Sequence, residues 1–144
     1  MNDNSNWSYK VPNATTSSTW IFPSYDASSW GVGPGGFGFG DNDDNTTIPT
    51  NSISVYSRIT FNISNVSEVV GLVLNVDYDD GFVAYLNGVE IARNGLTGSG
   101  QPTFNQVASI SHEALLYQNQ YPDQFYFNQS QLIGMLVSGQ NCLC

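Results

Sequence analysis

Apolar and polar side chains alternate most clearly between residues 53 and 63. The odd positions of this segment are mostly apolar and the even positions are mostly polar. A period of two places one set of side chains on a buried face, which is typical of a half-buried β-strand. Residues 70–78 repeat the pattern, with apolar side chains at the even positions. Both segments are therefore predicted to be strands with one buried face.

A β-hairpin is predicted between residues 82 and 92. Two short, mainly apolar runs, 82–86 and 89–92, flank Asn87 and Gly88. Asn and Gly both tolerate positive φ, which a type I′ turn requires at its two central positions. The segment is therefore expected to fold as two antiparallel strands joined by a two-residue turn.

Weaker signals fill the rest of the chain. A short helix is predicted over residues 130–138, with Ser130 as its cap and Gly139 after its end. Residues 31–51 are glycine-rich and then acidic, and they predict a loop. Further short strands are predicted at residues 7–11, 20–22, 104–110, 124–127 and 141–144.

About seven or eight short strands, without a long helix or a βαβ rhythm, predict an all-β fold. The expected architecture is an antiparallel β-sandwich of the jelly-roll type, forming a single domain over residues 1–144. The strand at 141–144 stops at the chain end and is expected to be incomplete. It is either truncated or left as an open edge that another chain completes.

Charge and composition restrict the possible partners. Twelve acidic residues against three basic ones give a net charge of -9, which argues against binding nucleic acid or an anionic membrane. The sequence contains no run of 18 apolar residues, so no membrane-spanning helix is predicted. Asn, Ser and Thr supply 42 of the 144 residues, and this composition favours an exported protein, extracellular or at the cell surface. No signal peptide is visible, so the chain is expected to be a mature form, a recombinant form or part of a longer chain.

The two cysteines, Cys142 and Cys144, lie on the last predicted strand. Side chains two positions apart on a strand point the same way. A disulfide between them would be strained, because disulfide geometry is narrow. They are interpreted as small core residues on an edge strand, with pairing to material outside this chain as the alternative.

Four motifs follow one another along the chain: D-A-S-S-W (26–30), G-F-G-F-G-D (36–41), V-Y-S-R-I-T-F (55–61) and D-Y-D-D-G-F-V-A-Y-L-N-G-V-E-I-A-R (77–93). In this order the chain resembles the galactose-binding-like jelly-roll modules of bacterial secreted and surface proteins. The resemblance implies a β-sandwich that accompanies carbohydrate-active enzymes. The D-D-G stretch also resembles lectin domains in which paired aspartates hold calcium and sugar hydroxyls.

The first acidic cluster, Asp41, Asp43 and Asp44, is a candidate metal site. Alternating oxygen ligands on a flexible loop suit Ca²⁺, which takes six to eight oxygens. The spacing is not that of an EF-hand, because the glycine and glutamate of that loop are missing. The alternative is a solvated turn capped by an aspartate side chain.

The second cluster is a candidate ligand site at a sheet rim. Asp79 and Asp80 lie between two predicted strands, and they are expected to bind sugar hydroxyls or a metal. Tyr78 and Phe82 are the expected aromatic platform for a sugar ring. The alternative is a tight turn in which the aspartates accept backbone N–H groups and Gly81 supplies a positive φ.

Catalysis is not expected. The single histidine, His112, has no triad partners or metal-ligand spacing around it, and no pair of carboxylates is singled out for glycoside hydrolysis. The favoured function is a non-catalytic extracellular module that binds a polysaccharide or another glycan, with a bound calcium ion. The alternative is a structural or adhesive module of a surface layer or filament, which self-associates through its strand edges or contacts other domains of a longer chain.

Overall fold

The computed structural model describes residues 5–40 and 44–144. Its elements are short strands joined by loops, three single-turn 3-10 helices and one α-helical turn. In chain order they are β1 (Asn6–Lys10), η1 (Ser18–Ile21), β2 (Gly31–Pro34), β3 (Phe37–Gly38), β4 (Thr46–Thr47), β5 (Tyr56–Ile63), η2 (Val66–Glu68), β6 (Gly71–Val76), β7 (Phe82–Leu86), β8 (Val89–Asn94), η3 (Leu116–Gln118), β9 (Asp123–Asn128), α1 (Gln129–Leu132) and β10 (Gly139–Leu143).

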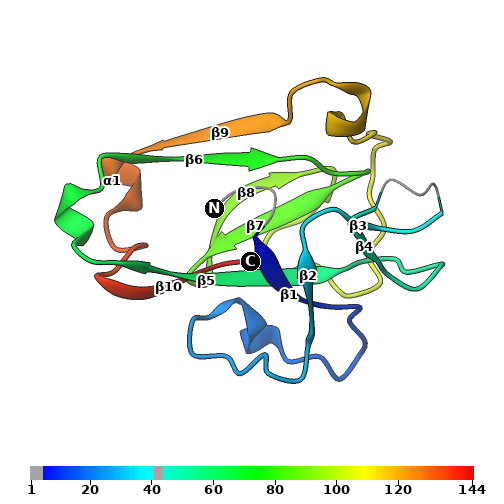
Figure 1. Cartoon of the computed structure of the whole chain (residues 1–144), viewed down its shortest axis with the longest axis horizontal. Helices are drawn as coiled ribbons and strands as arrows, with labels where there is room; N and C mark the ends of the chain where they lie inside the picture. Colours follow the sequence, from blue (N-terminus) through cyan, green and yellow to red (C-terminus); the bar gives the residue numbers. More distant parts are fainter. Residues whose placement is uncertain (1–4, 41–43) are drawn as a thin grey trace.

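Most of the strands belong to one antiparallel sheet with the order β2-β1-β5-β10-β7-β8. A second, two-stranded antiparallel sheet, β6-β9, packs over one face of it. The segment between β1 and β2 lies on the opposite face, below the large sheet in Figure 1. A short parallel pair, β3-β4, lies at one end. The predicted antiparallel β-sandwich is therefore confirmed.

Strand β7 shows why the sheet is covered on both sides. Ala84 and Leu86 point toward the small sheet and α1, and Ala84 clusters with Leu74 of β6. Tyr85 points the other way and packs against Trp20 of the β1–β2 segment. Because side chains alternate between the two faces of a strand, a nearly continuous apolar sequence suits a strand that is buried on both sides.

The hairpin prediction is confirmed, since Asn87 and Gly88 have φ values of 51° and 88° and join β7 to β8. Position 88 also needs glycine for space, because a Cβ there would overlap the ring of Phe22. The D-A-S-S-W motif folds as a turn in which the Asp26 carboxylate accepts the Ser28 N–H at 2.9 Å. That hydrogen bond holds the pKa of Asp26 below its ordinary value.

Two predicted strands are wrong. Residues 20–22 lie in and just after the 3-10 helix η1, where Ser17 caps the first turn by accepting the Thr19 N–H. Residues 104–110 form a turn and coil rather than a strand. The helix that forms, α1, starts one residue earlier than predicted, because Asn128 and Gln131 form a reciprocal capping box at its N-terminus. It is also shorter than predicted and ends at Leu132.

The terminal strand also differs from the prediction. β10 is not an edge strand, because it lies between β5 and β7 in the large sheet. Cys142 is fully buried there, and Cys144 exchanges both backbone hydrogen bonds with Tyr85 of β7. Burial of Cys142 agrees with the interpretation of a small core residue, whereas the expected position of this strand at a sheet edge is wrong.

The even positions of β5 were expected to face solvent, but Arg58 is only 5% exposed. Its guanidinium donates to the backbone oxygens of Phe22 and Tyr25 at 2.9 and 3.0 Å. The β1–β2 segment therefore covers this face of β5 as well. Among the described residues, no helix is long and apolar enough to cross a membrane.

Candidate functional site

The D-Y-D-D segment (77–80) connects β6 to β7 at one end of the sandwich. The Asp77 carboxylate accepts the backbone N–H groups of Leu115 and Leu116 at 2.7 and 3.1 Å. These are donors at the start of η3, which the N-cap residue Leu115 does not satisfy with its own side chain. Asp77 therefore positions the η3 segment beside the small sheet by capping it from another element.

Tyr78 joins three elements at this end. Its hydroxyl donates to Asp123 at the start of β9 at 2.9 Å and accepts from Asn94 at the end of β8 at 2.7 Å. Its ring stacks on His112 with centroids 4.0 Å apart and packs against Phe82. Burial, with the nearby Asp123 carboxylate, raises the pKa of Tyr78. At 7% exposure, the ring serves the core and does not offer a sugar the stacking face expected from the sequence.

Phe82 lies in the same internal cluster, with its ring edge-on to Phe125 of β9. Asp80 has a positive φ of 61° and bonds to the loop that carries His112. Its N–H donates to the His112 carbonyl at 2.7 Å, and its carboxylate accepts the His112 N–H at 3.1 Å. Asp79 contributes its carbonyl to the Gly81 N–H. The structure thus brings Tyr78, Asp80 and Phe82 together, and their contacts hold the strand ends and the loop of His112 in place.

Two of the three residues in the first acidic cluster, Asp41 and Asp43, lie outside the described residues. Asp44 is described, and its carboxylate lies over Gly38, where a Cβ would overlap it. The glycine therefore permits the close approach of the two segments. Within residues 5–40 and 44–144, no group of three or more His, Cys, Asp or Glu side chains is arranged to hold a metal ion.

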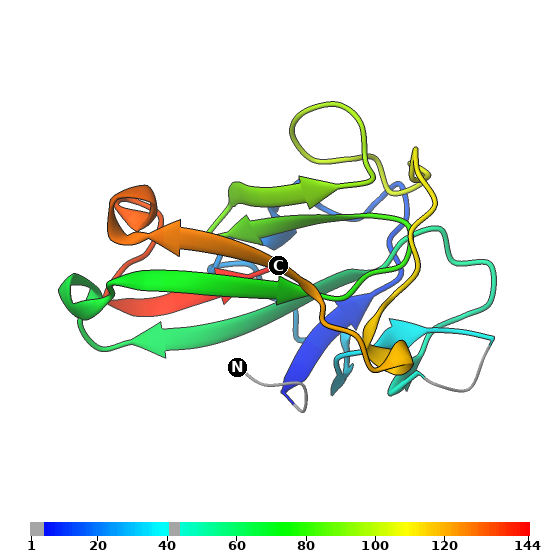
Figure 2. The same cartoon turned by 90° about the horizontal axis from the view of Figure 1, so that it is seen from above.

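A different surface carries accessible polar and aromatic groups: the solvent side of the small sheet, which faces the viewer in Figure 2. Val73 pairs with Tyr126 across the two strands, and Asn75 pairs with Gln124. These four side chains are exposed, with Tyr126 67% exposed and Val73 50% exposed. They are named here the amide–tyrosine face. Their neighbours Leu74 and Phe125 point inward to the core.

Hydrogen bonds order this face. The Tyr126 hydroxyl donates to Gln124 Oε1 at 2.6 Å, and Gln124 Nε2 donates to Asn75 Oδ1 at 2.8 Å. The chain of bonds runs from a ring to two amides and fixes their orientation. It leaves Asn75 Nδ2 without an acceptor among the described residues, so this donor faces solvent. The result is a flat apolar ring next to a row of oriented donors and acceptors.

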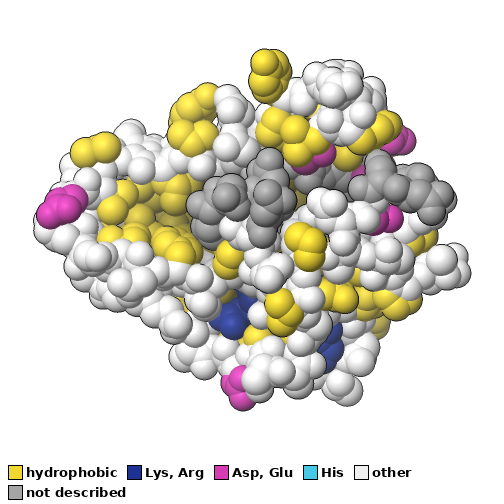
Figure 3. Space-filling model, in the orientation of Figure 1, with side chains coloured by type: hydrophobic (Ala, Val, Ile, Leu, Met, Phe, Trp, Pro, Cys, Tyr) yellow, Lys and Arg dark blue, Asp and Glu magenta, His cyan; other side chains and the backbone are white. Residues whose placement is uncertain are grey.

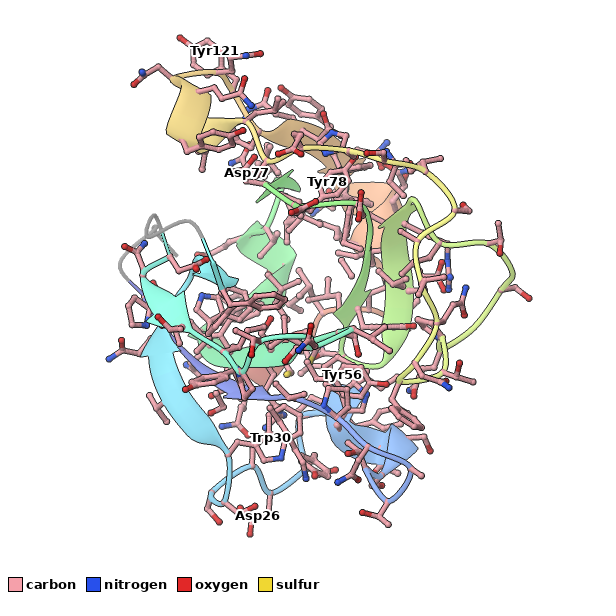
Figure 4. The ribbon with its side chains drawn as sticks, turned by 90° about the vertical axis from the view of Figure 1, so that its right-hand side faces the viewer. Asp26, Trp30, Tyr56, Asp77, Tyr78 and Tyr121 are labelled. Carbon is pink, nitrogen blue, oxygen red and sulfur yellow. The ribbon has the colours of Figure 1, made fainter. Side chains whose placement is uncertain are left out.

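The η3 segment forms a wall beside this face. A hollow of about 300 Å³ lies between them, lined by Asn75, Asp77, Leu116, Pro122 and Gln124. Tyr121, at the tip of the segment in Figure 4, is 88% exposed. In Figure 3, apolar side chains project from the rim formed by the small sheet and this segment, among neutral polar groups.

Sequence reasoning missed this face, although the signal was present. The segments 70–78 and 124–127 were both predicted as strands, but the residues between their apolar positions were read only as a solvent side. The amides and Tyr126 come together because β6 and β9 pair across about 50 residues of intervening chain, which the alternation of single strands does not reveal.

A likeness to a known protein is found in the fold. The chain resembles part of a β-glycosidase from Bacteroides vulgatus, seen in its crystal structure, with a TM-score of 0.51 and 14% sequence identity. The match covers 99% of this chain and 16% of that enzyme. No family model matches the chain, and no curated protein matches it. At this identity the likeness shows a shared β-sandwich domain, and this chain spans only a small part of the enzyme's length.

Proposed function

We propose that the chain is a non-catalytic carbohydrate-binding domain that binds a glycan across the amide–tyrosine face. The observation that carries the proposal is the bonded row Tyr126–Gln124–Asn75 beside an exposed ring. A sugar ring offers an apolar face and a rim of hydroxyls. The Tyr126 ring suits the apolar face, and amides act as both donors and acceptors for hydroxyls.

The fold gives this proposal a context. The β-glycosidase of Bacteroides vulgatus contains a part with the same fold, and that part is a small share of its length. We infer that this chain works as an accessory domain of a larger extracellular protein, where it keeps a catalytic domain near a polysaccharide. The galactose-binding-like resemblance of the four sequence motifs points the same way.

Charge favours a neutral glycan as the ligand. The protein carries a net charge of -9, and the side chains of the amide–tyrosine face are uncharged. The Asp77 carboxylate, which lines the hollow beside this face, already accepts two backbone N–H groups. A polyanionic glycan would meet a repulsive field without a cationic partner on this face, whereas a neutral polysaccharide would not.

A calcium ion remains part of the proposal at the loop of Asp41, Asp43 and Asp44. The chemistry of three carboxylates suits Ca²⁺. The second acidic cluster suits it less, because the carboxylates of Asp77 and Asp80 accept backbone N–H groups. The glycan proposal does not depend on the ion.

The test compares two amide pairs. Asn75→Ala/Gln124→Ala removes the pair on the proposed face, and Asn62→Ala/Gln140→Ala removes another exposed cross-strand pair, on the large sheet. Affinity electrophoresis through a panel of neutral polysaccharides measures Kd. Two lost hydrogen bonds of about 1 kcal/mol each predict a rise in Kd of roughly tenfold or more for the first variant, and no change for the second.

Equal effects of the two double variants, or retention on none of the polysaccharides, would contradict the proposal. The alternative is then a module that self-associates through sheet edges. β10 no longer supports it, but β6 and β9 pair only with each other among the described residues and so present unpaired edges. Light scattering over a range of protein concentrations detects such assembly.

A further inference from the structure

The buried guanidinium of Arg58 lies against a sulfur atom. Besides its two backbone carbonyl acceptors, Arg58 Nη2 donates to Cys142 Sγ at 3.2 Å. Among the described residues, the guanidinium forms no ion pair with a carboxylate, and its Nε atom has no acceptor. An arginine stays charged in a protein, and a buried charge without an opposite charge is destabilising. Arg58 therefore favours a negative charge next to it.

Two thiols lie beside the Arg58 guanidinium, and Cys142 Sγ is in direct contact with it. Cys142 Sγ and Cys144 Sγ are 2.8 Å apart, on the same side of β10. Both backbones are fixed by the sheet: the Cys142 N–H donates to the Asn87 side chain at 2.7 Å, and Cys144 pairs with Tyr85. Cys142 is fully buried, and Cys144 is partly accessible. The two sulfurs are thus held in contact. A disulfide between these positions is strained, as expected from the sequence, and strain makes such a bond easier to reduce.

The electrostatics assign the negative charge within the pair. The hydrogen-bonded contact with Cys144, together with the Arg58 charge, lowers the pKa of Cys142. The same contact and burial raise the pKa of Cys144. These contacts favour the thiolate at Cys142 over the thiolate at Cys144. Thiolates react with oxidants far faster than thiols do.

We propose that Cys142 and Cys144 are a redox-active pair, activated by Arg58, that a hydroperoxide converts to an intramolecular disulfide. The peroxide reaches the buried Cys142 sulfur from the side of the partly accessible Cys144. The Cys142 thiolate attacks one peroxide oxygen, so an S–O bond forms and the O–O bond breaks. The departing hydroxide or alkoxide takes a proton from solvent. The Cys144 sulfur then attacks the sulfenic sulfur of Cys142, an S–S bond forms, and the hydroxyl leaves as water with the Cys144 proton. Two thiols lose two electrons in total, and the hydroperoxide gains them.

Formation of the disulfide changes the surroundings of Arg58. The negative charge favoured at Cys142 disappears, and the guanidinium keeps its contacts with the carbonyls of Phe22 and Tyr25 and with the Tyr25 ring. Those carbonyls belong to the segment that carries Trp20 and Trp30. Oxidation therefore acts on the packing of this segment, and tryptophan fluorescence reports it.

The test treats the folded full-length chain with one equivalent of hydrogen peroxide, followed by alkylation in denaturant and intact-mass measurement. The expected product has lost two hydrogens, takes up no alkylating agent and returns to the starting mass with a phosphine reductant. Its tryptophan emission changes at the same rate. Arg58→Met is expected to slow the reaction about tenfold or more, because it removes the cation that favours the thiolate.

Two single variants keep the proposal falsifiable if Arg58→Met does not fold. Cys144→Ser is expected to stop at a sulfenic acid at Cys142, trapped by dimedone, whereas Cys142→Ser is expected to react about tenfold more slowly at Cys144. Circular dichroism confirms the fold of each. Two thiols that stay alkylatable after peroxide treatment, independent overoxidation of either sulfur without the disulfide, or faster reaction at Cys144 would each overturn the proposal.

Discussion

Two groups of aromatic residues lie on opposite sides of the molecule and are used in different ways. Below the large sheet, Trp20 stacks on Tyr56 with centroids 4.4 Å apart and meets Trp30 and Tyr85 at 6.1 Å. Above the small sheet, Tyr126 and Tyr121 are exposed, and neither contacts another ring among the described residues. Figure 4 shows the two groups at opposite ends of the view, with Trp30 and Tyr56 below and Tyr121 above.

Aromatic content alone therefore does not indicate a binding platform. The lower group is satisfied by its own contacts, so its rings contribute to the free energy of unfolding. The upper group leaves its apolar rings in water, next to ordered amides, so its rings are available to a ligand. Two features distinguish the groups: exposure of the rings to solvent, and hydrogen-bond donors beside them.

The largest expected effect is on the inner group. Trp20→Ala removes a ring that is 6% exposed and contacts three other rings. Loss of a buried aromatic side chain of this size is expected to lower the free energy of unfolding by about 3–5 kcal/mol. Urea denaturation measures this change. Tyr121→Ala, which removes a ring that is 88% exposed, is the control and is expected to change stability by less than about 0.5 kcal/mol.

A second prediction concerns the alkaline stability of the same group. Burial, with the nearby Glu90 charge, raises the pKa of Tyr85 to about 12. The unfolded chain loses this proton near its ordinary pKa of 10, while the folded chain keeps it. The contribution of the Tyr85 hydroxyl to the free energy of unfolding is therefore fully present below pH 10. It decreases between pH 10 and 12, by about 1.4 kcal/mol per pH unit.

Tyr85→Phe tests this assignment. Its hydroxyl makes one long hydrogen bond, to the Gly100 carbonyl at 3.5 Å, so the variant is expected to change neutral stability little. Its stability should then fall by about 1 kcal/mol less than that of the unmodified protein between neutral pH and about pH 11. Urea midpoints at the two pH values measure this. Parallel curves would show that Tyr85 ionises in the folded protein as readily as in the unfolded chain.

Local features of the fold were predictable from the sequence, whereas burial that depends on distant segments was not. The hairpin at Asn87 and Gly88 and the alternation of β6 follow from local chemistry. The sandwich follows from the number and spacing of the predicted short strands. Burial of Arg58 was not predictable from its polar character, because it depends on a segment more than 30 residues earlier that folds over β5.

The candidate site shows the same limit. Asp80 and Tyr78 were chosen for their residue types, and the structure uses both to connect the 95–122 loop to the strand ends. The alternative, in which the aspartates accept backbone N–H groups, describes Asp80 correctly, because its carboxylate accepts the His112 N–H. Tyr126 and Gln124 gain their importance only from the register of β9 against β6, and long-range register is not written in either strand alone.

The smallest expected effects separate the ring of Tyr126 from its hydroxyl. Tyr126→Ala removes both and is expected to weaken glycan binding about tenfold, because a stacked ring contributes about 1–1.5 kcal/mol. Tyr126→Phe keeps the ring and loses only the hydrogen bond to Gln124 Oε1. That change frees one amide to reorient and is expected to weaken binding about two- to fivefold.

Calorimetric titration with the best-retained polysaccharide measures both variants, and thermal melts confirm that neither loses stability. If Tyr126→Phe binds as weakly as Tyr126→Ala, the hydroxyl orders the amide row and the ring contributes little. If both bind like the unmodified protein, the glycan does not contact this face, and the exposed tyrosines differ from the buried aromatic group only in their solvation.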